Sequence, residues 1–436
     1  MVRMGQAGPF FRVGRALAAP GVRYTRAYPG RGRGVERRVA VARTDGRVAA
    51  PRLRRGPVVV AGAIVLYWLS LYLFVPVLAP QAHRLGAGVA GVGLVLASYG
   101  LVQFLLRIPV GIWSDRDGRR RPFFVAAVVA SGAGALGMGV AHGPLALGVF
   151  RGVSGLAACG WVAITLLFAE FFPAERTAWA MGVVGFLATG AQLVGTFAGG
   201  FVAQAAGFRA PFLAAAGVAV AALVAAVATR EPHAPGPARA MGLRQRLQVG
   251  RRRGVMVASG LSIASHYVTF TTVFGFVPLL ASERFSAGGA ALGVLALCSG
   301  VPSALVSLGS GRLAERWSAG RLTAAGFVLA AAATALLPLA PSLAALAGCV
   351  AVVGSGLGLI GPTLMTAAVR DVPAGGRGTA MGFYQSIYAI GMAGGPALAG
   401  WMGARLGMDG LFWTTAALAA SAGVLCVPLL AEARTR

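Results

Sequence analysis

The sequence predicts an all-α integral membrane protein in which twelve transmembrane helices form two pseudo-symmetric six-helix bundles. The chain of 436 residues is 57% hydrophobic and only 12% charged, which is far too apolar for a soluble protein of this length. Its apolar runs are each about 20 residues long, the length that an α-helix needs to cross a bilayer. The pattern of the first half also recurs in the second half, about 200 residues later.

The first 55 residues differ in composition from the rest. They carry fourteen arginines against Glu36 and Asp45, a net charge of +12 (14 minus 2), with Pro and Gly scattered among them. Such a segment cannot bury a core, so we expect residues 1–55 to be a disordered basic cytoplasmic tail. It either lies on anionic lipid headgroups or stays solvated, and it could also precede the true translation start. It has no short apolar core before a cleavage site, so a signal peptide is not expected.

Six apolar runs follow and form the predicted N-terminal bundle, residues 56–229. A polar connection, residues 230–253, contains seven arginines and three prolines in the sequence, which predicts an irregular cytoplasmic linker. Six more runs form the predicted C-terminal bundle, residues 254–431. The expected spans are 57–79, 91–110, 122–141, 144–168, 177–206, 208–229, 254–281, 288–310, 322–339, 342–368, 378–403 and 411–430.

Internal duplication supports the two-bundle arrangement. Short motifs of the first half recur at a nearly constant spacing, each at the corresponding place in a span. The recurring motifs include Phe74-Val75-Pro76 with Phe276-Val277-Pro278, Gly111 with Gly311, Arg116 with Arg316, Met181-Gly182 with Met381-Gly382, and Gly200 with Gly400.

The distribution of charge predicts the orientation. Arginines are concentrated in the breaks after even-numbered spans, which places both termini in the cytoplasm. A formal charge of +27 would suggest nucleic acid in a soluble chain, but here the charge lies in the tail and the breaks. Membrane lipids are therefore the expected partners, and nucleic acid is not. The four cysteines lie inside apolar runs and are read as buried hydrophobes.

One charged segment interrupts the apolar sequence between the second and third spans. It contains Gly111, Asp115 and Arg116, followed by Gly118, Arg119 and Arg120. This pattern resembles the signature loop of major facilitator superfamily transporters. The resemblance implies that superfamily's fold, with a substrate site between the two halves near the bilayer midplane.

The resemblance also implies a gate. In the family the acid of this loop, here Asp115, meets the start of a helix in the other half, here near Gly378. Gly111, Arg116, Gly118, Arg119 and Arg120 would complete that gate. The alternative for Arg120 is simple anchoring on the cytoplasmic side.

The fourth span carries an arginine within the membrane. The segment from Arg151 to Gly155 resembles the family's Arg-x-x-Gln-Gly element, with Ser154 in the Gln position. Arg151 lies roughly 10 Å along its helix, where a guanidinium must face an aqueous cavity, a partner helix or an anionic group. Substrate binding or tuning of proton transfer is one interpretation, and hydrogen bonding to carbonyl groups is the other.

The fifth span, with Gln192 and the glycines from Gly190 to Gly200, resembles the Gly-Pro-x-x-Gly-Gly element of exporter branches. Thr196 stands in the Pro position, whereas the eleventh span has Gly395-Pro396. The chain is thus most like the twelve-span drug/proton antiporter branch, which implies export. Close helix packing is the alternative role of these glycines.

His266 is the one titratable group near neutral pH that the sequence places in the middle of a span, about 18 Å deep. It is a candidate for proton coupling or an ordinary hydrogen-bonding residue. Aromatic and amide residues of facing spans predict a weakly polar cavity that suits an amphipathic or cationic organic solute. These residues are Tyr67, Tyr72, Tyr384, Gln385 and Tyr388.

These features favour a monomeric secondary transporter of the inner cell membrane, which exports small amphipathic organic compounds by alternating access with the proton as coupling ion. An importer of a small metabolite and a non-transporting sensor are the alternatives. The sequence has neither a nucleotide-binding Gly-rich loop nor a catalytic or metal-ligand cluster, so an enzyme, a cofactor and a metal are not expected.

Overall fold

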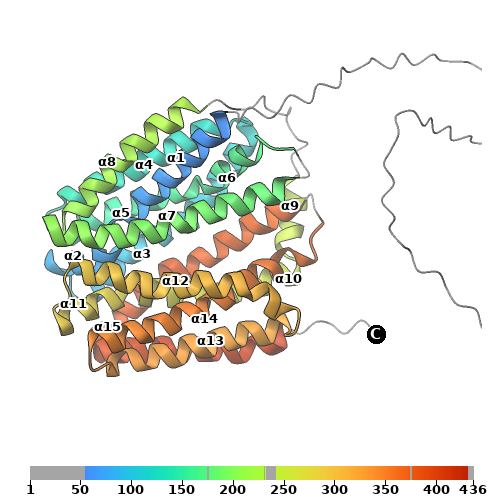
Figure 1. Ribbon diagram of the computed structural model, residues 1–436. Coiled ribbons are helices and arrows are strands. Elements are labelled where there is room, and N and C mark those ends of the chain that lie inside the picture. Colours follow the sequence, from blue (N-terminus) through green and yellow to red (C-terminus); the bar gives the residue numbers. More distant parts are fainter. Residues whose placement is uncertain (1–54, 174–175, 230, 232–241, 374–375, 431–436) are drawn as a thin grey trace, which may run out of the picture. The chain divides into compact units, whose positions relative to one another are not determined.

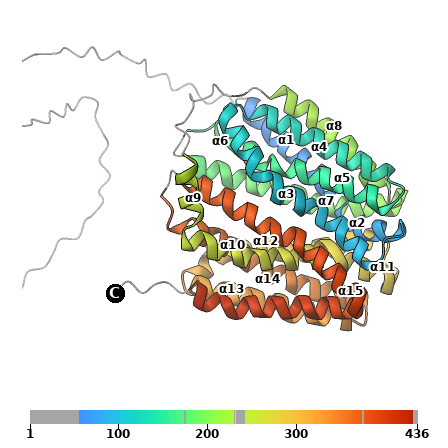
Figure 2. The same ribbon diagram turned by 180° about the vertical axis from the view of Figure 1, so that it is seen from behind.

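The computed structural model describes residues 55–173, 176–229, 231, 242–373 and 376–430, and these residues are almost entirely helical. The helices lie side by side with their axes in a similar direction (Figures 1 and 2). The expected basic tail lies outside the described residues except for Arg55, and most of the linker before Gly242 lies outside them as well.

The first half begins at the point where the sequence turns apolar. Its helices are α1 (Arg55–Tyr72), α2 (Val75–Arg84), α3 (Val89–Asp117), α4 (Arg121–Val140), α5 (Pro144–Cys159), α6 (Trp161–Ala169), α7 (Thr177–Ala206) and α8 (Ala210–Ala228).

The second half repeats this layout. Its elements are α9 (Leu243–Gly250), α10 (Arg253–Thr271), the π-helical turn η2 (Thr272–Phe276), α11 (Val277–Phe285), α12 (Gly289–Ala314), α13 (Ala319–Leu336), the 3₁₀ turn η3 (Leu337–Leu339), α14 (Leu343–Arg370) and α15 (Arg377–Leu429).

Within the described residues, eleven helices are long and apolar enough to cross a membrane. The last of them, α15, has 53 residues, a length of about 80 Å that far exceeds what one crossing needs. The backbone leaves the helical region at Gly407, with φ 78° and ψ 173°. Because α15 therefore contains two spans, the twelve predicted spans are present and the predicted fold class is confirmed.

The repeated Phe-Val-Pro motif marks the place where the first span of each half bends. In the first half the helix is interrupted between Tyr72 and Val75, and Pro76 lies in the first turn of α2. In the second half the π-helical turn η2 precedes Pro278 in the first turn of α11. Proline cannot donate the backbone hydrogen bond that a continuous helix requires, so the two halves break at equivalent points.

Two local expectations were wrong. The linker is not irregular throughout, because α9 forms between Gly242 and Arg251 from a short run of Leu, Arg and Gln that favours helix. The charged segment after the second span is mainly helical, since α3 continues through Asp117. Only then does Gly118 end the helix, with a left-handed φ of 68° that glycine adopts without steric cost.

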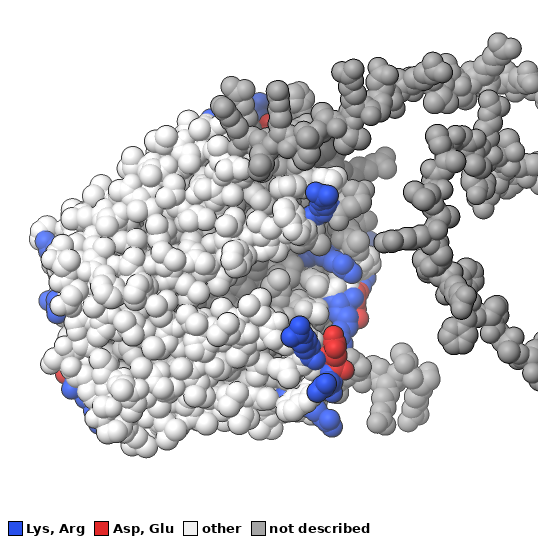
Figure 3. All heavy atoms as spheres, in the orientation of Figure 1, with Lys and Arg blue, Asp and Glu red and all other residues white. Residues whose placement is uncertain are grey.

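The bundle has two distinct ends. At one end, which we call the arginine end, α3 reaches Gly118 and α9 lies nearby; arginine side chains gather there in the space-filling view (Figure 3). At the other end, which we call the α2–α11 end, α2 of the first half contacts α11 of the second (Figure 1).

The halves make close helix contacts near the α2–α11 end. There α3 packs on α15 and α7 packs on α12. A Cβ atom added to Gly400 would lie 2.9 Å from the Cα atom of Gly93, and one added to Gly200 would lie 2.6 Å from that of Gly293. These two contacts are equivalent under the internal repeat. Toward the arginine end, by contrast, a Cβ on Gly111 would meet no atom within 4 Å.

Candidate functional site

Aromatic rings from the two halves form a continuous set of contacts in the interior of the bundle. Tyr72 of α1 lies 5.8 Å from Phe274 of η2, measured between ring centroids. Phe274 contacts Phe270 of α10 at 5.4 Å, and Phe270 stacks on Tyr99 of α3 at 6.1 Å. Because these rings come from both halves, the interface between the halves is lined by flat apolar surfaces.

His266 extends this aromatic lining on the second half. Its imidazole stacks on the ring of Tyr388 with the centroids 3.8 Å apart and the planes 5° from parallel. Its Nδ1 atom lies 2.9 Å from the carbonyl oxygen of Ser262. Since a carbonyl can only accept, Nδ1 carries a proton, which leaves Nε2 as the atom that can gain or lose one.

Tyr384, one turn before Tyr388 on α15, is held by the same serine. Its hydroxyl lies 2.5 Å from the hydroxyl of Ser262, and the Tyr384 and Tyr388 rings meet edge to face at 5.5 Å. His266, Ser262, Tyr384 and Tyr388 therefore form one contacting group.

Arg107 of α3 reaches across the interface to this group. It is 6% exposed, and its Nη1 atom donates to the carbonyl oxygen of Gln385 and to the hydroxyl of Tyr388, each at 3.3 Å. Its Nη2 atom donates to the carbonyl oxygen of Ala158 on α5 at 3.3 Å. The guanidinium thus joins helices of both halves through neutral oxygen atoms, and its Nε atom has no hydrogen-bond partner.

Arg151 of α5 is the second buried arginine at the interface. It is 4% exposed, and its guanidinium carbon lies 4.1 Å from the centroid of the Tyr99 ring and 5.5 Å from that of Phe74. Its Nε and Nη1 atoms are buried without a hydrogen-bond partner. Burial of a guanidinium with unpaired donors is unfavourable.

Two other predicted site residues lie apart from this group. Tyr67 is fully buried in the core of the first half, where its hydroxyl donates to the carbonyl oxygen of Ala157 at 2.8 Å. Gln192 is half-buried on α7 and makes no side-chain hydrogen bond within the described residues. Of the first-span aromatics, Tyr72 is the one that joins the interface, through Phe274.

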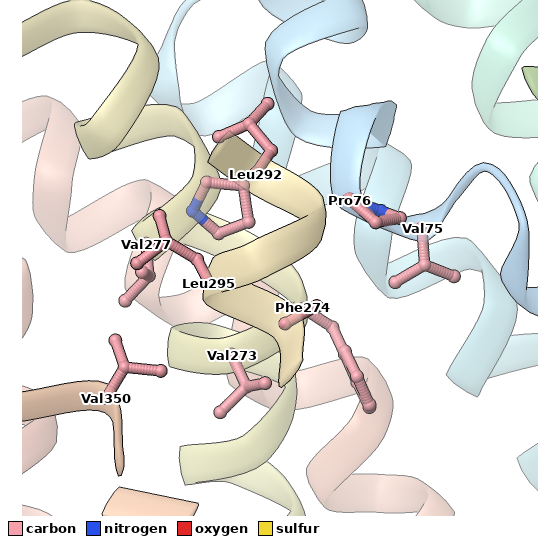
Figure 4. Close-up of a pocket in the computed structure, with 10 residues that line it drawn as sticks. Val75, Pro76, Val273, Phe274, Val277, Leu292, Leu295 and Val350 are labelled. Atoms are coloured by element: carbon pink, nitrogen blue, oxygen red, sulfur yellow. The ribbon is translucent and has the colours of Figure 1, made fainter. Parts of the chain in front are cut away.

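The two halves are in close contact at the α2–α11 end. A small pocket lies there, lined by Val75 and Pro76 of the first half and by Val273, Phe274 and Val277 of the second (Figure 4). Its volume is about 10 Å³, which is at the lower limit for one water molecule. At the same end the Nε2 atom of His83 lies 3.2 Å from the Oε1 atom of Glu283, so a polar side-chain contact also joins α2 to α11.

The arginine end contains the predicted gate residues. Arg116, Arg119 and Gly378 are exposed, while the side chain of Asp115 lies outside what the structure describes. Arg120 is half-buried; its Nη1 atom donates to the Ser114 hydroxyl at 2.9 Å.

Arg120 also takes part in a cluster of charges that the sequence did not reveal. Its Nε atom lies 3.6 Å from the Oε1 atom of Glu170, which follows α6. The carboxylate of Glu231 accepts hydrogen bonds from the backbone N–H groups of Arg120 and Arg121. Glu231 therefore caps the start of α4. Its carboxylate accepts from free N–H groups there and interacts favourably with the positive end of the helix dipole. Burial raises the pKa of Glu170, an effect that Arg120 opposes and Glu231 reinforces.

Sequence reasoning missed Arg107 and Glu231 as functional candidates. Arg107 could have been found, because an arginine inside an apolar run is itself a signal of function. Glu231 could not, since it stands at the start of a polar linker and its contact with α4 depends on how α8 and α4 pack.

Comparison with known proteins agrees with this architecture. The sequence profile of the Major Facilitator Superfamily matches residues 60–264 and 259–436. The inner membrane transport protein YajR of Escherichia coli strain K12 is 25% identical over 373 residues, which cover 81% of this chain and 79% of that protein.

Solved structures show the same fold at low sequence identity. A mutant of the nucleoside transporter NupG superposes with a TM-score of 0.70 at 12% identity, covering 85% of this chain and 99% of that one. A bacterial homologue of the human lysosomal transporter Spinster, inward-facing and unoccupied, superposes with a TM-score of 0.68 at 17% identity, covering 86% and 94%. With both halves matched by the family profile, the chain belongs to the Major Facilitator Superfamily and is a multi-pass membrane transporter of the secondary type.

Proposed function

We propose that the protein exports small amphipathic organic compounds across the inner cell membrane by alternating access, in exchange for protons. The observation that carries the proposal is the interface between the halves. There, aromatic rings of both halves surround His266 and the buried guanidinium groups of Arg107 and Arg151. Flat apolar surfaces with a few polar groups are typical of sites for amphipathic ligands.

The packing of the halves supports alternating access. They are in close contact at the α2–α11 end, through Gly93 with Gly400 and Gly200 with Gly293, whereas Gly111 and Gly311 toward the arginine end have open space. The excess of arginine supports a cytoplasmic position for the arginine end and for both termini. In this arrangement the central site takes a solute from the cytoplasm, and the gate at Asp115 and its neighbours closes as the halves rock.

His266 is the proposed proton carrier. Among the acids whose side chains the structure describes, none lies in the middle of a span, whereas His266 lies at the interface with Nε2 available for protonation. Its stacking on Tyr388, which also binds Arg107, links its charge to the part of the site that crosses between the halves.

Efflux of dyes tests the proposal. Cells that express the chain are loaded with anionic, neutral and cationic amphipathic dyes, and efflux is followed with and without a protonophore. We expect chain-dependent efflux of at least one dye that the protonophore slows several-fold. The His266→Gln variant keeps a polar side chain but cannot carry a proton, so its efflux should no longer respond to the pH gradient.

A matched control uses His142, an exposed histidine between α4 and α5 of the first half. His142→Gln alters an imidazole outside the aromatic interface and should keep the response to the pH gradient. A response that survives in His266→Gln would place the coupling elsewhere. Chain-dependent uptake without efflux would instead identify an importer with the same fold and site.

A further inference from the structure

We propose that the central site binds an organic anion, specifically an aromatic or amphipathic carboxylate, through the guanidinium groups of Arg107 and Arg151. This inference rests on the proposed transport function and specifies the chemical class of its substrate. The sequence alone leaves an amphipathic and a cationic solute open, and this inference selects against the cation.

The first argument is the balance of charge. Arg107 and Arg151 are 6% and 4% exposed, and the partners that the structure gives them are carbonyl, hydroxyl and aromatic groups. Among the acids with described side chains, those of the spans lie at helix ends and not beside these arginines. Two buried positive charges without a carboxylate make the site complementary to an anion.

The second argument is that the unpaired buried atoms of these arginines are all hydrogen-bond donors. The buried atoms without partners at the interface include Nε and Nη1 of Arg151 and Nε of Arg107. Each of these is obligatorily a donor, so a ligand satisfies them only by presenting acceptors. A carboxylate does so best, because its two oxygens match the fork of a guanidinium. The amide of Gln385, which leaves Oε1 unpaired, can present its NH₂ group instead by rotation.

The third argument concerns the rest of the solute. Tyr99 and Phe270 stack face to face across the interface, and Phe274 continues this surface. Such rings bind a flat apolar body well. They would also attract a cation in the absence of other charges, but the face of Tyr99 is already occupied by Arg151 at 4.1 Å. The guanidinium of Arg151 would therefore repel a cationic solute at the place where it attracts an anionic one.

Two dyes with the same xanthene ring system and opposite charge make the test direct. Fluorescein carries a carboxylate and is anionic at pH 7.5, and rhodamine 6G is a cation. Binding of each to the purified full chain in detergent is measured by fluorescence anisotropy. We expect fluorescein to bind at least tenfold more tightly than rhodamine 6G, and benzoate to compete with fluorescein.

Variants of the two arginines identify the site. Arg107→Gln and Arg151→Gln should each weaken fluorescein binding at least tenfold without weakening that of rhodamine 6G. Arg151→Lys keeps the charge but loses the planar fork of donors. Its affinity for fluorescein should lie between that of Arg151→Gln and that of the unaltered chain. Arg321→Gln is the matched control, because Arg321 is exposed on α13 and away from the interface. This variant should bind both dyes with the affinity of the unaltered chain.

A stability measurement separates binding from a structural role. If Arg151 serves the ligand, removal of its unpaired charge should leave the unfolding temperature of the dye-free protein unchanged or higher. A lower unfolding temperature together with unchanged fluorescein binding would assign the arginine to structure and overturn the proposal.

Flux of the same dyes from proteoliposomes distinguishes this inference from the function on which it rests. Transport of rhodamine 6G without binding of fluorescein would overturn the anion site and leave the transporter standing. Arginine-dependent binding of fluorescein without flux would support the anion site and overturn transport of such compounds. Failure of both dyes to bind would overturn the anion site.

Discussion

Glu170 shows how a single side chain at the arginine end reports on its surroundings. Its carboxylate lies beside Arg120, which favours the charged form, yet its pKa is raised from the ordinary value of 4.5 because burial, with help from Glu231, outweighs that ion pair. A carboxyl group with a raised pKa binds its proton more tightly in the folded protein than in the unfolded chain. It therefore stabilises the fold fully below about pH 4.5 and loses that contribution as the pH rises through the raised value.

Glu170→Gln tests this sign. The unaltered protein in detergent should show an unfolding temperature that declines as the pH rises from 4.5 through the raised pKa of Glu170, and the variant should lose that part of the decline. Glu315→Gln, an exposed acid on the second half, serves as the control and should keep the full decline. If Glu170→Gln instead lowers stability at every pH, the ion pair with Arg120 dominates over burial.

At the scale of elements, the closure of the α2–α11 end depends on glycines that let helix backbones touch. A methyl group on Gly200 of α7 would lie 2.5 Å from the carbonyl oxygen of Gly289 on α12. On the same helix, a methyl group on Gly190 would meet no atom within 4 Å. Alanine at position 190 therefore tests the helix preference alone, and alanine at position 200 tests the steric clash as well.

Gly190→Ala and Gly200→Ala should have opposite effects. Alanine favours helix over glycine by about 1 kcal/mol, so Gly190→Ala should raise the unfolding temperature. At Gly200 the added methyl group meets backbone atoms, and overpacking of that kind costs about 1–3 kcal/mol, so Gly200→Ala should lower it and reduce transport. An equal rise for both variants, measured by thermal unfolding in the same detergent, would contradict the close approach of α7 to α12.

The spans could be predicted from the sequence because twenty-residue apolar runs and their repeat are strong local signals. The fifth span, residues 177–206, matches α7 in the structure. The shared helix face of Tyr384 and Tyr388 was also predictable from their four-residue spacing, whereas the stacking of His266 on Tyr388 was not. The reach of Arg107 to Tyr388, the cap that Glu231 gives α4, and the position of Tyr67 inside the first half were not, because each depends on how separate helices pack.

At the scale of the whole molecule, a buried anion site is consistent with export. A membrane potential that is negative inside drives a monovalent anion outward with about 2.3 kcal/mol per 100 mV. Exchange of that anion for an inward proton moves two charges in the favourable direction, so both components of the proton gradient would act on the same cycle. Export would then require only that the halves open and close in turn around Arg107 and Arg151.

Such a cycle requires the α2–α11 end to open, and a crosslink across it tests this requirement. The side chains of His83 on α2 and Glu283 on α11 lie in contact at 3.2 Å, and both are accessible enough to react. We expect a chain with His83→Cys and Glu283→Cys to lose at least tenfold in flux when a short bis(methanethiosulfonate) reagent, which forms a disulfide with each thiol and releases sulfinate, joins the two positions, and to recover it on reduction of those disulfides. Either cysteine alone should keep its flux after the same treatment, because α2 and α11 stay free to separate. Undiminished flux in the crosslinked chain would mean that solute leaves without separation of the halves at this end, and alternating access through it would be wrong.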